Sequence, residues 1–380
     1  MTSRVGNAHS PSEVKRPSFV YWCSLWGVGS AISIVSIAVD IRGSQMQTVL
    51  GRDFSNLWVA GKLALSGQTW AIFNPDTFRV ALHEYLGVVS LQNYSYPPHA
   101  LFIAAPFGLL NYFTALALWT LLGTWFFVRC AKPYLPEAFP PVLSVLTPAA
   151  TLNTWNGHYG FLLGGLWLIC FRNLHRAPAR AGLVAGILTF KPHMGLFIAV
   201  AVLTKRKALL VAALTTLALI IASAILFGGW PDFLMRTTAE QAGILSRTRG
   251  EFYFRMMPSA YVAFGRGVSG VVAQTTVALA AIWMLAKSRK VEPFAMATAT
   301  FVIVPYVFNY DMTVACLGFA MTLFSRWGEL GIAERAGFSL AFLTPALNYV
   351  APWPVPLILL YALALQLEVR NFDSERYDLA

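Results

Sequence analysis

The strongest constraint on this chain is a series of apolar segments separated by short, mostly basic clusters. The first apolar run covers residues 19–39. The later ones cover 99–110, 112–130, 141–152, 158–171, 181–203, 207–228, 259–286, 293–308, 311–325, 335–350 and 353–368. Hydrophobic residues make up 57% of the 380 and charged residues only 12%, whereas a soluble chain carries about a quarter charged residues. The pattern therefore predicts a polytopic membrane protein.

The net charge of +11 reflects where the basic residues lie. Basic clusters occur at 129–132, 172–180, 205–207 and 287–290, and at Arg326 and Arg335. This arrangement is typical of cytoplasmic loops, so we expect membrane lipids and no nucleic acid as partners. The four cysteines, Cys23, Cys130, Cys170 and Cys316, lie in or beside apolar segments. Their spacing fits neither a metal site nor a disulfide framework, and we expect small packing residues and no bound metal.

Charge asymmetry also predicts the topology. Residues 1–18 form a cytoplasmic tail, 19–368 a single transmembrane domain and 369–380 a second cytoplasmic tail. The mixed charge of residues 40–97 predicts a first outer loop, and 229–256 would form a second large outer loop. We thus expect an all-α polytopic membrane protein in which the polar loops face the periplasm or the cell exterior.

Several apolar segments are too short to cross a bilayer, since a spanning helix needs about 20 residues. Residues 99–110 and 141–152 are such segments, and "FKPH" at 190–193 divides the run 181–203. Interrupted backbone at membrane depth survives only where protein buries it or where it lines a wet cavity. We therefore expect roughly 10–12 transmembrane or re-entrant helices around a cavity, by this segment count.

A carboxylate stands just outside the first apolar run, in "GRDFSNLWVAGKLALSG" at 51–67. Asp53, beside Arg52, is followed by apolar residues at spacings of three and four, which predicts an amphipathic helix at the membrane interface. One interpretation makes Asp53 the N-cap of that helix. The other makes it a general base that faces a cavity.

Two further polar stretches interrupt the apolar pattern. "YSYPPH" at 94–99 contains Tyr96, and its prolines alternatively make it a rigid entry to the next helix. "NTWNGHYG" at 153–160 contains Asn156 and His158, whose side chains could hydrogen-bond a sugar or a phosphate. A lone histidine is more often a structural hydrogen-bonding residue, and that alternative stays open for His158.

Candidate anion ligands follow in the second half of the chain. Lys191, which His193 follows in "TFKPH", lies at a predicted helix break and could bind a phosphate, or its ammonium could reach the interface. Three outer-loop residues could grip a lipid phosphate or contact bulk headgroups: Arg247, Arg249 and Arg255. In "FNYDM", Tyr310 precedes Asp311, which would either cap a helix or orient a substrate hydroxyl.

The ordered set of motifs resembles glycosyltransferase family 87. "RDFSNLWVAGKLALSGQTWAIFNPDTF", "YSYPPHALFIAAPFGLLNYFTALALW", "NTWNGHYGFLLGGLWL" and "AGLVAGILTFKPHMGLFIAVAVLTKRK" carry the resemblance, and "YVFNYDM" adds weaker agreement. It runs from about Arg52 to Trp230. The chain departs from the family pattern at His158, where glutamine is frequent, and some members carry a histidine pair near "FNYDM".

The resemblance implies a GT-C-like bundle and an inverting, mannosyltransferase-like activity. The donor would be a sugar on a polyprenyl phosphate, and the acceptor a glycolipid or polysaccharide at the outer face of the inner (plasma) membrane. Asp53 would be the catalytic base. Lys191 and an outer-loop arginine would hold the donor phosphate, and no cofactor would be required.

Two other classes of protein fit the same polar residues. A polytopic transporter or flippase of a lipid-linked or anionic solute would also need broken helices and a basic outer loop. A non-catalytic scaffold of a polysaccharide assembly would need neither a base nor a phosphate ligand. The amino-acid pattern alone leaves both open.

Overall fold

The computed structural model describes residues 16–43, 50–87, 92–244, 254–288 and 292–368. In this part of the chain the regular structure is helical, with no strand. The longer helices are α1 (Phe19–Gly43), α2 (Arg52–Leu65), α4 (Pro75–Leu86), α5 (Leu101–Gly108), α6 (Tyr112–Ala131), α7 (Pro148–Asn156), α8 (Gly160–Asn173), α9 (Pro178–Ile187), α10 (Leu196–Leu203), α11 (Arg206–Leu226), α16 (Val268–Ser288), α17 (Pro293–Ile303), α18 (Thr313–Arg326), α19 (Ile332–Val350) and α20 (Val355–Glu368). Short α-helices are α3 (Thr69–Ile72), α12 (Trp230–Asp232), α13 (Thr238–Ile244) and α15 (Ala260–Ala263).

Single turns join several of these helices. They are 3₁₀ turns at η1 (Pro98–Ala100), η2 (Lys132–Tyr134), η3 (Pro141–Ser144), η4 (Leu188–Phe190), η5 (Pro192–Gly195) and η7 (Asn309–Asp311), and a π-helical turn at η6 (Phe233–Thr237). Most lie where proline or glycine interrupts an apolar run, since proline removes a backbone donor and a helix cannot continue through it.

The predicted class, an all-helical polytopic membrane protein, is confirmed. Among the described residues, four helices are long and apolar enough to cross a membrane, at Phe19–Ala38, Tyr112–Tyr134, Arg206–Leu226 and Val268–Ser288. Six shorter apolar helices of 10–17 residues pack beside them. On α11 the side chains of Leu210, Leu214 and Ile225 are exposed, as expected of a helix whose outer face contacts lipid. The predicted tails at 1–18 and 369–380 lie largely or wholly outside the described residues.

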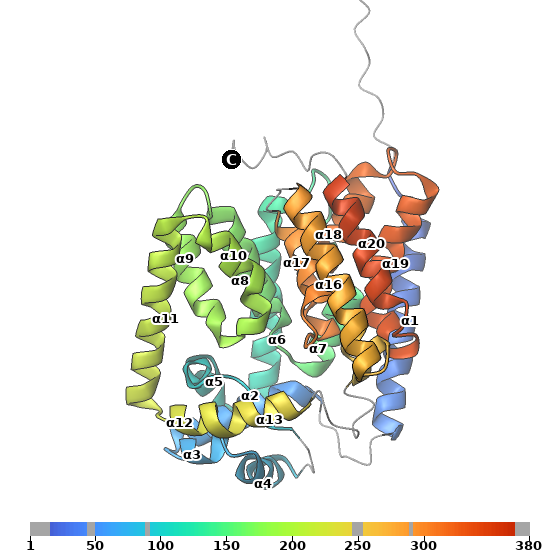
Figure 1. The fold of residues 1–380 in the computed structure, drawn as a ribbon. Helices are drawn as coiled ribbons and strands as arrows, with labels where there is room; N and C mark the ends of the chain where they lie inside the picture. Colours follow the sequence, from blue (N-terminus) through green and yellow to red (C-terminus); the bar gives the residue numbers. More distant parts are fainter. Residues whose placement is uncertain (1–15, 44–49, 88–91, 245–253, 289–291, 369–380) are drawn as a thin grey trace, which may run out of the picture.

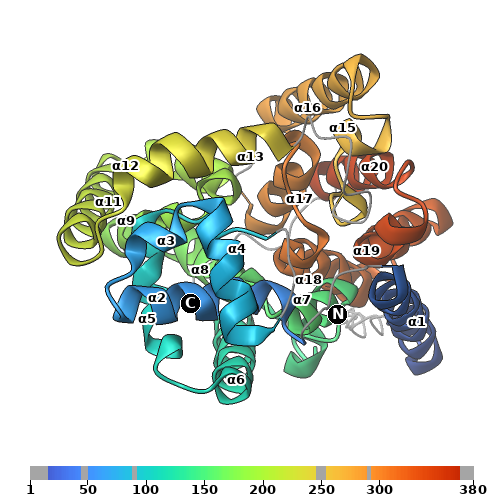
Figure 2. The same cartoon turned by 90° about the horizontal axis from the view of Figure 1, so that it is seen from below.

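The helices form two sets, one upright and one transverse to it. Helices α6 and α8–α11 stand on one side of Figure 1, and α1 and α16–α20 stand on the other. Helices α3, α4, α12 and α13 lie across one end of this bundle, and Figure 2 shows them with α2 and α5 over that end. Extensive contacts join α2 to α5, α9 to α11, α6 to α8 and α1 to α19. The predicted amphipathic helix is thus α2, within the transverse layer.

Side-chain caps fix where several helices begin. The Asn74 carboxamide accepts from the Asp76 N–H, Asn111 accepts from Thr114 N–H, and Thr147 Oγ1 accepts from Ala150 N–H. Each satisfies one of the backbone donors that a helix start leaves unpaired. The capping residues are visible in the sequence, so these boundaries follow from local chemistry.

The predicted break within 181–203 is confirmed, whereas the single apolar segment predicted over 259–286 is wrong. Helix α9 ends at Ile187 and α10 begins at Leu196, with one 3₁₀ turn before Lys191 and one after it. In the second case α15 and α16 are separate helices. Gly265 (φ 105°) and Arg266 (φ 53°) have left-handed backbone between them, a conformation that ends a right-handed helix.

Two glycines set how closely the transverse layer approaches α5. A Cβ atom on Gly61 would lie 2.4 Å from the Ala104 carbonyl oxygen, and one on Gly108 would lie 2.5 Å from the Gly61 carbonyl carbon. Small residues at such a crossing allow the two backbones to touch. This contact fixes the height of α2, and with it the position of Asp53.

Candidate active site

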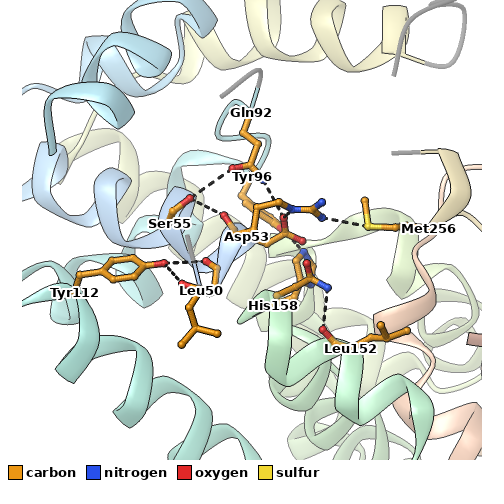
Figure 3. A network of polar contacts seen from close by, with 12 residues as sticks. Leu50, Asp53, Ser55, Gln92, Tyr96, Tyr112, Leu152, His158 and Met256 are labelled. Carbon is orange, nitrogen blue, oxygen red and sulfur yellow. Dashed lines mark hydrogen bonds and ion pairs between the residues drawn. The ribbon is translucent and has the colours of Figure 1, made fainter. Parts of the chain in front are cut away.

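The start of α2 is held by backbone contacts with α6 and α7. The Tyr112 hydroxyl donates to the carbonyl oxygens of Leu50 and Gly51, at 2.7 and 3.0 Å (Figure 3). The Gly51 N–H donates to the Trp155 carbonyl at 3.1 Å. Gly51 itself has φ 75°, which favours a residue without Cβ. These contacts hold the first turn of α2 against the start of α6 and the end of α7.

The Asp53 carboxylate is buried with one oxygen engaged and one without a partner. Its Oδ1 accepts from Arg52 Nε and from Gln92 Nε2, each at 3.1 Å, and Figure 3 shows this cluster. Its Oδ2 is buried and makes no hydrogen bond with any residue that the structure describes. A buried acceptor without a donor is costly and is a natural place for a substrate hydroxyl.

The N-cap interpretation of Asp53 is wrong. Gly51 occupies the cap position, no side chain caps α2, and Asp53 lies inside its first turn. Burial alone would raise the pKa of Asp53, but the charge of Arg52 and its hydrogen bond counter burial, and that pKa lies below its usual value. Asp53 is therefore ionised at neutral pH.

His158 lies at the predicted helix break and connects two parts of the cluster. Helix α7 ends at Asn156, and Gly157 follows with φ 63°. The Asn153 carboxamide accepts from the Gly160 N–H at 2.9 Å and so ties the two sides of the break together. His158 Nε2 and the Tyr96 hydroxyl lie 2.8 Å apart. His158 is thus a buried hydrogen-bonding residue.

Burial and the nearby Lys191 charge lower the pKa of His158. The imidazole is therefore neutral at pH 7. Its Nδ1 lies 3.4 Å from Asp311 Oδ1, and neither atom makes a hydrogen bond within the described residues. His158 consequently has one ring nitrogen committed to Tyr96 and one that faces a carboxylate.

Lys191 and Asp311 form a buried ion pair. Lys191 Nζ donates to Asp311 Oδ2 at 2.5 Å, and the two side chains are 3% and 0% exposed. The helix-cap interpretation of Asp311 is wrong. Helix α18 begins at Thr313, Met312 takes the cap position without a side-chain bond, and Asp311 belongs to η7. Both residues lie where the backbone is interrupted.

The remaining candidate residues differ in how they lie relative to this cluster. The Tyr310 ring lies 4.2 Å from that of His158, and the His193 ring lies 5.5 Å from that of Tyr306. Asn156 donates to the Leu152 carbonyl of its own helix at 2.9 Å, so its amide stabilises α7. Arg255 is exposed. Arg247 and Arg249 lie outside the described residues.

Gln92 is a site residue that the sequence analysis missed. It bonds Asp53 from the far end of the first outer loop, 39 positions along the chain. Nothing in "LQNYSYPPH" distinguishes it from an ordinary loop glutamine. Only the fold, which returns this segment to the start of α2, identifies it.

An apolar groove of about 400 Å³ opens beside the cluster. Helices α5, α6 and α8 line it with side chains that include Phe102, Phe107, Trp125, Phe126 and Phe161. His158 is the one titratable residue in its lining. The groove therefore has an aromatic, apolar wall and touches the polar cluster at His158.

The comparison with known families decides what kind of protein carries this arrangement. The model of glycosyltransferase family 87 matches residues 94–308, which is more than half of the chain. The chain belongs to glycosyltransferase family 87. No curated protein and no solved structure gives a significant match.

Membership makes the protein a glycosyltransferase, and it agrees with the resemblance of the motifs. Tyr96, His158 and Lys191 lie inside the matched range, whereas Asp53 and Asp311 lie outside it. The structure brings these two outlying acids to the matched residues. A polar cluster assembled from both parts of the chain, at the end of an apolar groove, is the candidate active site of this family 87 glycosyltransferase.

Proposed function

We propose that the protein transfers a sugar from a polyprenyl-phosphate carrier to a glycolipid or glycan acceptor, with inversion at the anomeric carbon. The groove that ends at His158 carries the proposal. Its aromatic and aliphatic walls suit a hydrocarbon chain, and its polar end suits a sugar phosphate. A water-soluble nucleotide sugar would gain nothing from such a wall.

Asp53 acts as the general base in this proposal. Its unpartnered Oδ2 takes the proton of the acceptor hydroxyl as that oxygen attacks the anomeric carbon. The bond between that carbon and the phosphate oxygen breaks, and polyprenyl phosphate leaves with its electron pair. Arg52 and Gln92 hold Oδ1 and so fix the orientation of the carboxylate. Positioned general bases contribute about 10²–10⁴-fold to the rate.

Lys191 would stabilise the leaving phosphate. A lysine ammonium has three N–H donors, and the contact with Asp311 uses one of them. The remaining donors would be free for a phosphate while Asp311 keeps the ammonium in place. Arg247, Arg249 and Arg255 stay proposed phosphate ligands from the second outer loop. The substrate contacts expected from the sequence, or residues that support them, stay proposed: Arg52, Tyr96, Asn156, His158, His193, Tyr310 and Asp311.

The site would face the periplasm or cell exterior of the inner membrane. Support comes from the basic residues: their clusters lie at the helix ends away from the transverse layer, whereas the first outer loop has mixed charge, with Arg52, Lys62 and Arg79 among its acids. The positive-inside rule then directs the layer outward. Lipid-linked donors and lipid acceptors would reach the site from that leaflet.

The test uses the full chain in nanodiscs with a panel of polyprenyl-phosphate sugars and a membrane glycolipid extract. Mass spectrometry follows the addition of one hexose or pentose. We expect product from the wild type and a loss of at least about 100-fold in Asp53→Asn. The matched control is Asp76→Asn, because Asp76 lies in the same loop with a 92% exposed side chain. It should transfer like the wild type.

Two results would contradict the proposal. Wild-type transfer by a folded Asp53→Asn protein would show that Asp53 is not the general base. Movement of an intact lipid-linked sugar across vesicles, with no new glycosidic bond for any donor, would support the flippase alternative instead.

A further inference from the structure

A second polar seam lies at the end of the bundle opposite Asp53. It joins the start of α1 to the start of α19 (Figure 1). The Tyr21 hydroxyl and Ser339 Oγ share a hydrogen bond across the seam. The Tyr21 ring also packs 4.6 Å from that of Trp327, at the end of α18. The ends of three helices, α1, α18 and α19, therefore meet around Tyr21.

Arg335 is a cation in this seam and forms no ion pair with any residue that the structure describes. Its guanidinium carbon lies 4.5 Å from the centre of the Trp327 ring. Its Nε is buried and makes no hydrogen bond within the part of the chain that the structure describes. The two nearest acids along the chain are already engaged. Glu329 pairs with Arg326 at 2.6 Å, and Glu334 accepts from the Gly331 N–H at 2.6 Å.

A second cation and a second unpaired donor lie at the same end. The Arg16 guanidinium carbon is 5.1 Å from the centre of the Phe324 ring. The indole Nε1 of Trp22 is buried without an acceptor, and that ring contacts Tyr21 edge-on at 5.8 Å. Buried donors without acceptors are unfavourable unless a ligand or water satisfies them.

The surroundings of the seam are those of a lipid tail. Phe19 and Val20 on α1 and Ile332 on α19 are 82%, 71% and 86% exposed. Apolar side chains so exposed at the ends of membrane helices contact acyl chains, whereas a free phosphate would gain nothing from them. A diacyl lipid would place its headgroup beside Arg335 and its tails along these residues.

We propose that this seam is a binding site for an anionic phospholipid of the basic, inner leaflet. Arg335 donates to the phosphodiester, Trp22 Nε1 supplies a second donor, and Arg16 adds positive charge at the rim. The planar guanidinium is suited to the task because it binds phosphate through two N–H groups while it stacks on Trp327. The site is independent of glycosyl transfer.

Native mass spectrometry of the full chain in detergent tests this site. The probe is dioleoyl phosphatidylglycerol, and dioleoylglycerol, which has the same tails without phosphate, is the comparison. We expect one tightly retained phosphatidylglycerol and a roughly tenfold weaker Kd in Arg335→Gln. Arg335→Lys should restore part of the affinity, since lysine returns the positive charge but not the paired N–H donors of the guanidinium. Trp22→Phe should weaken binding by about threefold.

The matched control is Arg180→Gln, which removes one exposed charge from the basic cluster at 172–180. It should bind phosphatidylglycerol like the wild type. Equal binding by Arg335→Gln and wild type would overturn the proposal, as would equal retention of dioleoylglycerol. Displacement of the lipid by soluble glycerol 3-phosphate at similar affinity would identify a free-phosphate site instead. If Arg335→Gln does not fold, unchanged lipid affinity in Trp22→Phe and Arg335→Lys together would also overturn it.

Discussion

Lys191 Nζ and Asp311 Oδ2 lie 2.5 Å apart although 120 residues separate them in the chain. Each residue lies at a helix interruption, one after η4 and the other in η7. The pair joins the α8–α11 side of the bundle to the α16–α20 side (Figure 1), and Asp311 Oδ1 also lies 3.4 Å from His158 Nδ1. It therefore acts structurally in the free enzyme, in addition to the phosphate contact proposed for Lys191.

Removal of one partner should destabilise the protein. Lys191→Met leaves the Asp311 carboxylate buried without its counter-ion, and an unpaired buried charge costs about 3–5 kcal/mol. Asp311→Leu likewise leaves the Lys191 ammonium buried without its counter-ion. We expect both single variants to unfold at lower temperature in detergent, as measured by differential scanning fluorimetry.

The double variant separates the structural role of the ion pair from the catalytic role proposed for Lys191. Lys191→Met with Asp311→Leu removes both charges, so its unfolding temperature should lie above those of both single variants. Transfer should stay lost, because no ammonium remains to stabilise the leaving phosphate. Recovery of transfer together with stability would limit Lys191 to a structural role.

The ionisation of Asp53 predicts the acid side of the pH profile. The folded pKa of Asp53 is lowered below its value in the unfolded chain, so the carboxylate form is favoured by folding. That contribution is present above the unfolded pKa and disappears as pH falls through the folded pKa. We expect no acid limb from Asp53 in kcat/KM above about pH 4.

The Arg52→Gln variant tests whether Asp53 controls the acid limb of kcat/KM. Loss of the adjacent charge should raise the pKa of Asp53, while Gln92 still holds Oδ1. The acid limb of kcat/KM should therefore move to higher pH. An unchanged limb in the variant would show that another group controls the acid side.

The local chemistry of the sequence predicts much of this molecule. Apolar runs locate the upright helices, and the proline and glycine positions in "FKPH" and "NGHYG" locate the breaks that carry Lys191 and His158. The pairing of Lys191 with Asp311 could not be predicted, because it depends on which helices become neighbours. Gln92 was missed for the same reason. Asp53 was placed in the correct helix, but the left-handed Gly51, and not Asp53, begins it.

The contact between α2 and α5 should be intolerant of a single methyl group. Gly61→Ala would place Cβ 2.4 Å from the Ala104 carbonyl oxygen, which forces α2 and Asp53 to shift. We expect a loss of about 1–3 kcal/mol in stability and a lower kcat. Gly27→Ala is the control, since Gly27 is also helical but has nothing within 4 Å of its added Cβ. That variant should be neutral or slightly stabilised.

The groove should discriminate donors by chain length. Gly123 lines it, and an added Cβ would meet Phe161 only at 3.4 Å, so Gly123→Leu fills the groove without a severe backbone clash. We expect KM to rise about tenfold for a long polyprenyl donor and little for a short-chain analogue that does not reach this wall. Leu121→Phe, on the same helix but 67% exposed to the lipid side, should leave both values unchanged. An equal rise for the two donors would mean that the substitution distorts the polar cluster, and no rise for either would place the carrier chain outside this groove.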